Sequence, residues 1–543
     1  MIRDRDLQAV QEVRTLLERA KKAQLEFKKI SQQQVDRVFA AMAEAGFEAS
    51  EKLARMAVEE TGYGKITDKI VKNQFGSRDV YEAYKDMPTV GVIREDKARR
   101  IIEIAEPVGV VAAIIPTTNP TSTALFKCLI AVKARNGIVV SPHPRAAQCT
   151  AETVRVLQAA ATQAGAPDGL IGCMSVMHLD GTDALMRAPE VGVILATGGP
   201  GLVRAAYSAG KPAYGVGPGN VPVYIDRSAQ VEKAIADAVA GKTFDWGTLC
   251  SSEQALVIDE PVYEQALSLL RAHKAYFMNA DEAKRVGEAL VSRDGRINAE
   301  LVGHSPQAIT EYAGFTISDD VQLLVAEVDG VGPDYPLSRE KLSPVLALYR
   351  ADGWEAGCER CIELLNIGGR GHTLAIHAQD DEVVLQFGLH KPAFRIVVNT
   401  PASVGAVGYT TSLDPSMTLG CGSLGGNITA DNISPKHLMN IKRGAYETKP
   451  LAKQRPSYEA WRPAKNRESA AANGDFPYQK VFSDVSRKGI KKQQPVPPEK
   501  TPAAPAQQPT EPKSNAYGYG TQGISGAEVD RMVADFLRER KLG

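Results

Sequence analysis

Short apolar runs that alternate with helical patterns constrain the fold of this chain more than any other feature. Residues 108–116 and 191–198 read as buried strands, as does the run GIVVSP, and helical patterns cover residues 122–135 and 151–164. Strands that alternate with helices are typical of a parallel sheet, because parallel strands need a long crossover connection. We therefore expect an α/β fold with a doubly wound, Rossmann-type domain over residues 1–225.

A second α/β domain is expected over residues 226–447. It contains further strand-like runs, which lie at residues 254–258, 343–349, 373–377 and 394–399.

Two other patterns surround the first sheet. Apolar residues recur at helical spacing over residues 4–60, which predicts amphipathic helices. Two β-rich runs flank a charged turn at about residues 90–106, which predicts a hairpin arm.

The end of the chain has a different composition. Residues 448–523 are rich in proline, lysine and glutamine, which predicts an extended linker of low order. Residues 524–543 predict an amphipathic helix, because Ser525 and Glu528 have capping-box spacing. Its apolar stripe consists of Val529, Met532, Val533, Phe536 and Leu537. So short a helix is marginal alone in water, so we expect it to dock on a partner, with folding back on its own chain or disorder as alternatives.

Composition excludes several classes of protein. The 543 residues carry 64 Lys+Arg and 64 Asp+Glu, which argues against a nucleic-acid binder. The longest apolar runs are too short to span a membrane, and the N-terminal residues lack a signal-peptide core. Seven scattered cysteines indicate reduced thiols in a cytosol-like compartment. Cys358 and Cys361 form one CxxC pair without a second, which favours a packed helix face over a metal site.

Cys250 is the candidate nucleophile. It lies in FDWGTLCSSEQAL, where small and polar neighbours favour an exposed thiol over a buried structural one. A thiolate adds to a carbonyl carbon and can hold the acyl group as a thioester. An ordinary thiol is only slightly ionised at neutral pH, so we expect the site to favour the thiolate.

Two polar residues have spacing and context that fit the same chemistry. Asn119 lies in PTTNP between a strand and a helix, where its amide could donate to an oxyanion together with the backbone N–H of Cys250. His372 in GGRGHTLAIH could act as acid or base toward an incoming thiol. Taken alone, each has an ordinary alternative, as a turn asparagine and as a structural histidine.

Two glycine-rich stretches follow strands. ATGGPG (196–201) precedes a helical pattern, so its glycines could bring a pyrophosphate near helix N–H groups. Neither it nor YGVGPGN (214–220) matches GxGxxG, so the dinucleotide signal is weak by itself.

Several separate motifs occur together in a recognisable order: residues 106–136, SPHPRA, residues 194–220, FDWGTLCSSEQ and GHTLAIH. Over about residues 5–447 the chain resembles the CoA-acylating aldehyde dehydrogenases, including the bacterial microcompartment enzymes for propionaldehyde and acetaldehyde. The resemblance implies an NAD-binding domain, a catalytic domain with Cys250, and a homo-oligomer (dimer or tetramer) built through the hairpin arm.

The resemblance also assigns roles to residues. It implies that Cys250 is the nucleophile, that Asn119 is the oxyanion donor and that His372 lies close to the reaction centre. It implies no metal, and it places NAD along Thr117, Thr118, His143, Pro144, Thr197, Gly198, Gly199, Gly215, Val216, Gly217 and Glu340. Arg145, near His143, leaves NADP open as an alternative.

One departure from the hydrolytic aldehyde dehydrogenases indicates the acyl acceptor. Gly215 stands near the position of their general-base glutamate, so water attack on a thioester would lack assistance. The expected reaction is aldehyde + NAD⁺ + CoA → acyl-CoA + NADH, by a ping-pong route, with propanal as the first choice and acetaldehyde as the second. A carboxylate-producing dehydrogenase and a catalytically silent cargo protein are the alternatives.

The tail resembles the encapsulation peptides of microcompartment cargo. That resemblance implies a shell protein as partner and a location inside a microcompartment of the bacterial cytoplasm.

Overall fold

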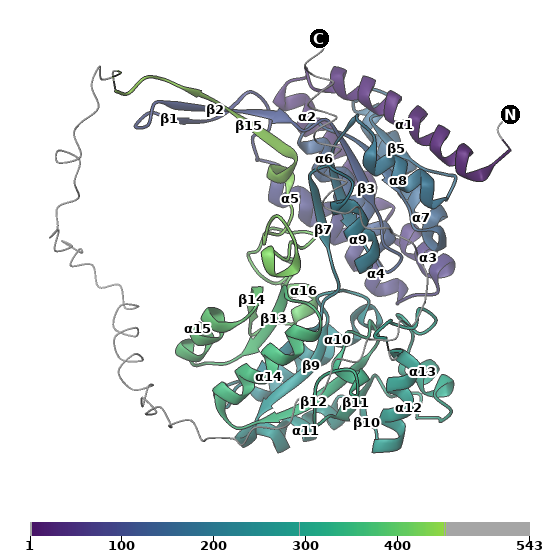
Figure 1. Ribbon diagram of the computed structural model, residues 1–543, viewed down its shortest axis with the longest axis vertical. Coiled ribbons are helices and arrows are strands. Elements are labelled where there is room, and N and C mark those ends of the chain that lie inside the picture. The colour runs from purple at the N-terminus through teal and green to yellow at the C-terminus, as the bar shows by residue number, and fades with distance from the viewer. Residues whose placement is uncertain (1–2, 293, 450, 452–543) are drawn as a thin grey trace, which may run out of the picture. The chain divides into compact units, whose positions relative to one another are not determined.

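The fold is known from a computed structural model that describes residues 3–292, 294–449 and 451 (Figure 1). Residues 3–292 and 294–449 belong to one unit, Met1–Pro450. The expected terminal helix at residues 524–543 and almost all of the expected linker lie outside the described residues, so both stay predictions.

The first sheet has five parallel strands in the order β5-β4-β3-β6-β7. The strands are β3 (Val110–Ile114), β4 (Gly137–Ser141), β5 (Ile171–Cys173), β6 (Val191–Thr197) and β7 (Ala213–Val216). The chain builds outward from β3 through β4 to β5, and then returns to the other side of β3 with β6. The strand order therefore reverses between β3 and β6, which confirms the expected doubly wound domain and marks the point where such sheets bind ligands.

Helices cover both faces of this sheet (Figure 1). Val111 and Ala113 of β3 pack with α2, α6 and α7, whereas Val110 and Ala112 pack with α1, α8 and α9. Such a strand is buried on both sides, which is why its sequence is apolar throughout. The helices are α1 (Arg5–Phe27), α2 (Gln32–Glu48), α6 (Pro120–Lys133), α7 (Ala147–Gln163), α8 (Leu179–Arg187) and α9 (Pro200–Tyr207).

The N-terminal helices continue beyond the predicted residues 4–60. After α3 (Ser50–Thr61), a glycine-containing turn leads into α4 (Ile66–Gln74), which runs through a π-helical turn (Phe75–Asp79) into α5 (Val80–Tyr84). The helix α4 matters for the site, because its buried side carries two lysines.

The second sheet has seven parallel strands in the order β10-β11-β12-β9-β8-β13-β14. Four of them confirm the predicted runs, and β8 precedes residue 226 yet lies within this sheet. The strands are β8 (Val221–Ile225), β9 (Glu253–Asp259), β10 (Ala275–Phe277), β11 (Leu323–Glu327), β12 (Val345–Ala351), β13 (Gly371–His377) and β14 (Ala393–Val398).

Helices pack on both faces of the second sheet as well. α10 and α11 share one apolar cluster with its strands, and α14 and α15 share another on the opposite face. The helices are α10 (Val231–Thr243), α11 (Tyr263–Ala272), α12 (Ala280–Leu290), α13 (Pro306–Tyr312), α14 (Gly353–Ile367), α15 (Asp381–His390) and α16 (Ala402–Gly405).

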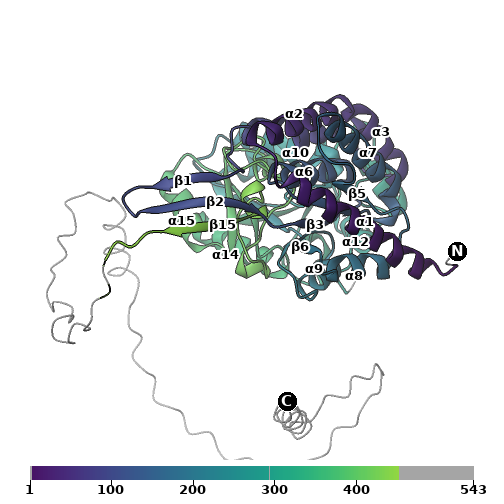
Figure 2. The same ribbon diagram turned by 90° about the horizontal axis from the view of Figure 1, so that it is seen from above.

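The predicted hairpin arm is confirmed and has a third strand. β1 (Val92–Asp96) and β2 (Ile101–Pro107) are antiparallel, and β15 (Met439–Ala445) pairs along the other edge of β2 (Figure 2). The role of this arm in oligomerisation stays a prediction. Within the described part of the chain, no helix combines the length and apolar character needed to cross a bilayer.

Candidate active site

Cys250 lies in the loop between α10 and β9, and its surroundings differ from the expected ones. It is only partly exposed and packs against the apolar cluster of α10 and the second sheet. Its polar neighbours bond to the backbone near α16: the Ser251 hydroxyl donates to the carbonyl of Ser403 at 2.8 Å, and a carboxylate oxygen of Glu253 accepts from the N–H of Ala402 at 2.6 Å. The thiol is therefore less exposed than predicted, because protein groups rather than water satisfy the polar flanks.

The buried environment disfavours the Cys250 thiolate. Burial raises the pKa of the thiol to about 12, with further contributions from Glu340 and Cys421, while the guanidinium of Arg395 acts in the opposite direction. The expectation that the resting site would favour ionisation is thus wrong, and the thiol needs a base to react at neutral pH.

The structure brings Asn119 to the loop of Cys250. Asn119 is buried directly before α6, and its Nδ2 donates to the carbonyl of Thr248 at 3.2 Å and to Oγ1 of Thr118 at 3.1 Å. Because Thr248 is two residues before Cys250, the amide and the thiol belong to one local site.

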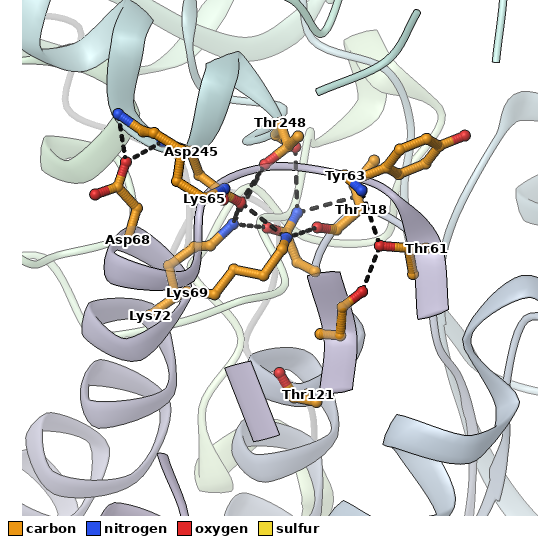
Figure 3. Close-up of polar contacts among 12 residues, drawn as sticks. Thr61, Tyr63, Lys65, Asp68, Lys69, Lys72, Thr118, Thr121, Asp245 and Thr248 are labelled. Atoms are coloured by element: carbon orange, nitrogen blue, oxygen red, sulfur yellow. Dashed lines mark hydrogen bonds and ion pairs between the residues drawn. The ribbon is translucent and has the colours of Figure 1, made fainter. Parts of the chain in front are cut away.

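A buried cluster of three charged residues supports this loop (Figure 3). Lys69 and Lys72 extend from α4 toward Asp245, and the exposed fractions of the three side chains are 2%, 5% and 0%. Lys69 Nζ lies 3.0 Å from Asp245 Oδ2 and 3.0 Å from the carbonyl oxygen of Thr118. Lys72 Nζ contacts Asp245 Oδ2 and Asn119 Oδ1 and lies 3.3 Å from Thr248 Oγ1.

The charges in this cluster depend on one another. Burial lowers the pKa of Lys72 to about 8 although Asp245 acts against it. Burial alone would raise the pKa of the Asp245 carboxyl, but Lys69 and Lys72 hold it below its usual value. Asp245 is therefore ionised, and its negative charge favours the ammonium form of Lys72.

Hydrogen bonds to residues at the start of α4 hold the turn that contains Asp245. Asp245 and Trp246 have φ of 49° and 52°, in the left-handed region that costs most residues free energy. The N–H of Lys65 donates to Asp245 Oδ1 at 2.7 Å, and the N–H of Asp245 donates to Asp68 Oδ2 at 2.7 Å. A methyl group on Gly64 would lie 2.0 Å from Asp245 Oδ1, so this contact requires glycine.

His372 also lies close to the loop of Cys250. It is a fully buried residue of β13, and its Nδ1 lies 2.9 Å from Thr373 Oγ1. A methyl group placed on Gly219 would lie 2.0 Å from the carbonyl oxygen of Cys250 and 3.4 Å from Cε1 of His372, so both residues adjoin Gly219. The structure thus brings all three candidate catalytic residues to one region.

The imidazole of His372 is neutral and has an unbonded nitrogen. Burial, together with the positive charge of Arg395, lowers its pKa to about 3. Its Nε2 is buried and has no hydrogen-bond partner among the described residues.

Arg395 is a site residue that the sequence did not indicate. It lies on β14 opposite Thr373 of β13, and its guanidinium donates to the carbonyls of Gly420 and Ala430. Its charge acts on both Cys250 and His372. No motif signals such a residue, because its partners are backbone carbonyls of a distant loop.

The candidate cofactor residues gather at one edge of the first sheet. Thr117 and Thr118 follow β3, and His143 and Pro144 follow β4. Thr197 ends β6, and Gly198 and Gly199 connect it to α9. These are the carboxyl ends of three adjacent strands at the point where the strand order reverses. Thr197 Oγ1 is buried there without a hydrogen-bond partner in the described part of the chain, which fits a polar ligand.

The remaining candidates lie at the end of β7, in the loop after it, and in the loop before β12. Gly217 has open space where a side chain would stand, whereas Val216 is buried at the end of β7. Glu340 accepts the N–H of Gly219 at 3.0 Å, and burial raises the pKa of its carboxyl to about 8. Glu340 also acts on the Cys250 thiol, so it is within electrostatic reach of the reaction centre.

Gly215 has no room for a side chain. A methyl group there would lie 2.7 Å from Val203 Cγ1 and 3.0 Å from the ring of Tyr207. The Tyr207 hydroxyl accepts the N–H of Gly215 at 2.9 Å. Tyr207 and Val203 therefore occupy the space that a carboxylate side chain at this position would need.

No metal site is found among the described residues, since no three potential ligands come together there. Cys358 and Cys361 are buried on α14 within an apolar cluster, which confirms the packed helix face.

Known proteins resemble this chain over most of the described residues. The profile of the aldehyde dehydrogenase family matches residues 4–313. The bifunctional aldehyde-alcohol dehydrogenase AdhE of Escherichia coli (strain K12) is 45% identical over 438 residues, which are 80% of this chain and 49% of that protein. The chain therefore spans about half the length of this curated relative.

Two solved structures are also similar. An acetylating aldehyde dehydrogenase from Geobacillus thermoglucosidasius is 53% identical with a TM-score of 0.82, and the match covers 83% of this chain and all of that one (100%). A propionaldehyde dehydrogenase from the fucose utilisation bacterial microcompartment of Clostridium phytofermentans is 26% identical with a TM-score of 0.73, covering 80% and 97% of the two chains. Because the family profile matches more than half of the chain and the Geobacillus protein is 53% identical over its whole length, the chain belongs to the aldehyde dehydrogenase family.

Proposed function

We propose that the protein is a CoA-acylating aldehyde dehydrogenase, which catalyses aldehyde + NAD(P)⁺ + CoA → acyl-CoA + NAD(P)H + H⁺. The observation that carries this proposal is the filled space at Gly215. A hydrolytic enzyme needs a base that activates water beside the acylated cysteine, and Val203 and Tyr207 leave no room for one at this position. The similarity to the Geobacillus protein, an acetylating aldehyde dehydrogenase, supports the same choice.

Cys250 forms the covalent intermediate. The Cys250 thiol loses its proton, which leaves as the H⁺ of the overall reaction, and its sulfur adds to the carbonyl carbon of the aldehyde. The carbonyl oxygen becomes an oxyanion that the Asn119 amide and the Cys250 N–H stabilise. Both hydrogens of the Asn119 amide are already bonded, to Thr248 and Thr118. The half-buried Thr118 hydroxyl is the partner that the oxyanion replaces, because the Thr248 carbonyl is fixed within the loop.

His372 serves the second half of the reaction. Its neutral imidazole offers Nε2, which has no competing partner among the described residues, as acceptor for the proton of the CoA thiol. The CoA sulfur then attacks the acyl carbon, the bond to Cys250 breaks, and the cysteine leaves as a thiolate.

The residues at the edge of the first sheet fit a nicotinamide dinucleotide. Residues 197–199, just before α9, and Thr117 would hold its polar groups, and Glu340 lies on the side of the reaction centre. When bound, the dinucleotide supplies the oxidant that turns the adduct on Cys250 into a thioester.

We further propose propanal as the substrate, with acetaldehyde second, and delivery of the enzyme to a microcompartment shell by residues 524–543. The sequence pattern of the tail supports this delivery, as does the microcompartment origin of the Clostridium structure. Removing residues 523–543 should leave kinetics in solution unchanged and abolish co-purification with shell proteins. Unchanged co-purification would refute the docking role.

The reaction itself is tested with propanal and NAD⁺, with and without CoA. We expect sustained NADH formation only with CoA, and a single turnover without it. Cys250→Ala should abolish both, whereas Cys173→Ala, which changes a partly exposed cysteine of β5, should behave as wild type. Sustained NADH formation without CoA would instead establish a carboxylate-producing enzyme, and an inactive wild type would favour a silent cargo protein.

A further inference from the structure

We propose that Lys72 and Asp245 are positioning residues that fix the direction of the Asn119 amide and thereby present its N–H to the reaction centre. The inference rests on the proposed function, in which Asn119 stabilises an oxyanion. It adds a role for the buried cluster of Lys69, Lys72 and Asp245, which the resemblance to known enzymes did not assign.

The oxygen and nitrogen of an asparagine amide have nearly the same size, so packing alone does not decide which of them faces Cys250. The hydrogen-bond partners of the amide decide its direction. The ammonium of Lys72 can only donate, and it contacts Asn119 Oδ1. The carbonyl of Thr248 can only accept, and it receives Asn119 Nδ2 at 3.2 Å. A reversed amide would point N–H groups at an ammonium and oxygen at a carbonyl, so only one direction is satisfied.

Asp245 in turn fixes Lys72. Its Oδ2 accepts hydrogen bonds from Lys72 and Lys69 and from the Thr248 hydroxyl, the last at 2.6 Å. The same carboxylate therefore holds the ammonium that orients Asn119 and the threonine two residues before Cys250. The Asp245 carboxylate therefore helps to position both expected oxyanion donors, which are the Asn119 amide and the Cys250 backbone N–H.

The charge balance of the cluster points to the same role. Two lysines face one aspartate, which leaves one buried positive charge in excess next to Asn119. A cluster that only stabilised the fold would gain nothing from this excess, because buried ions lose hydration. The cost of burying this charge therefore indicates a role beyond fold stabilisation, and the contact of Lys72 with Asn119 Oδ1 supplies one.

The test compares Lys72→Met with Lys69→Met. Both changes remove one buried ammonium bonded to Asp245, but only Lys72 contacts Asn119. We expect Lys72→Met to lower the rate of the single turnover with propanal and NAD⁺ by about 10²-fold, the usual effect of losing an oxyanion donor. Lys69→Met should lower it by less than about tenfold, and neither should change the KM for NAD⁺.

A second readout separates positioning from general damage to the site. Iodoacetamide alkylates the Cys250 thiolate without forming an oxyanion, and the charges that act most on this thiol are Glu340, Cys421 and Arg395. Alkylation of Lys72→Met should therefore proceed at the wild-type rate. Equal losses in the two lysine variants, or a parallel loss of alkylation, would overturn the inference.

Two further variants keep the outcome decisive. In the Asn119→Ala background, Lys72→Met should cause little additional loss, because the amide that it orients is absent. If Lys72→Met does not fold, Lys72→Gln serves instead: its amide can donate or accept, so it no longer enforces one direction, and an unchanged turnover rate would contradict the proposal. A wild type without CoA-dependent turnover would refute the proposed function itself, whereas an active wild type with insensitive variants would refute only the role of Lys72.

Discussion

The surroundings of Cys250 near Asn119 and those near His372, called here the Asn119 side and the His372 side, differ in how completely their polar groups are bonded. On the Asn119 side, the amide, the Lys72 ammonium and the Asp245 carboxylate all have protein partners. On the His372 side, Nε2 of His372 and Nε of Arg395 are buried without partners among the described residues.

This difference separates two tasks that a covalent enzyme must perform. An oxyanion is stabilised best by donors that are already fixed, because the protein then need not reorganise during the reaction. A group that exchanges a proton with an incoming molecule must instead remain available. Unsatisfied buried polar atoms are uncommon in folded proteins, so those on the His372 side are consistent with a place reserved for the second substrate.

His372→Gln should give the largest effect in the half-reaction that uses CoA. We expect the CoA-dependent turnover to fall by about 10²–10⁴-fold, the usual contribution of a general acid or base. The single turnover of NADH formation without CoA should fall far less. Stopped-flow absorbance measures both phases, and an equal loss in both would show that the two sides are not specialised.

Asn119→Ala should give the opposite pattern. The single turnover without CoA should slow by about 10²–10³-fold, because an oxyanion donor is lost. Alkylation of Cys250 by iodoacetamide should stay at the wild-type rate. A variant that is acylated normally but fails to transfer its acyl group to CoA would contradict the assignment.

The pH dependence of Cys250 alkylation measures the smallest effect. Because burial raises the pKa of this thiol to about 12, the protonated form dominates and the thiolate fraction rises about tenfold per pH unit below that value. The logarithm of the alkylation rate should therefore increase with a slope of one from about pH 7 to pH 10. A plateau near pH 9, as for an ordinary thiol with a pKa of about 8.5, would show that the resting site does not disfavour the thiolate.

Much of the fold could be predicted because it depends on local patterns. The buried strand at residues 108–116 and the hairpin at residues 90–106 are visible as an apolar run and as two β-rich runs around a turn. β15 was not expected, because its mixed sequence becomes a strand only beside β2, far away in the chain. The place of β8 within the second sheet was also not predicted, since the sequence of a strand does not indicate which strands it pairs with.

The site was predictable to a similar degree. Cys250, Asn119 and His372 each stand in a distinctive motif, and the structure brings them together. The cluster of Lys72 and Asp245 was missed, because charges on a helix usually face solvent and the two residues are distant in sequence. The burial of Cys250 was misjudged for a related reason: its polar flanks bond to the backbone of residues 402–403.

The central claim is that Cys250 carries an acyl group until CoA removes it. The direct measurement is the mass of the peptide containing Cys250 after the protein has reacted with propanal and NAD⁺ in the absence of CoA. We expect the mass of one propionyl group on this peptide, and its disappearance when CoA is added. An unmodified peptide, or a propionyl group that water removes as rapidly as CoA does, would contradict the account.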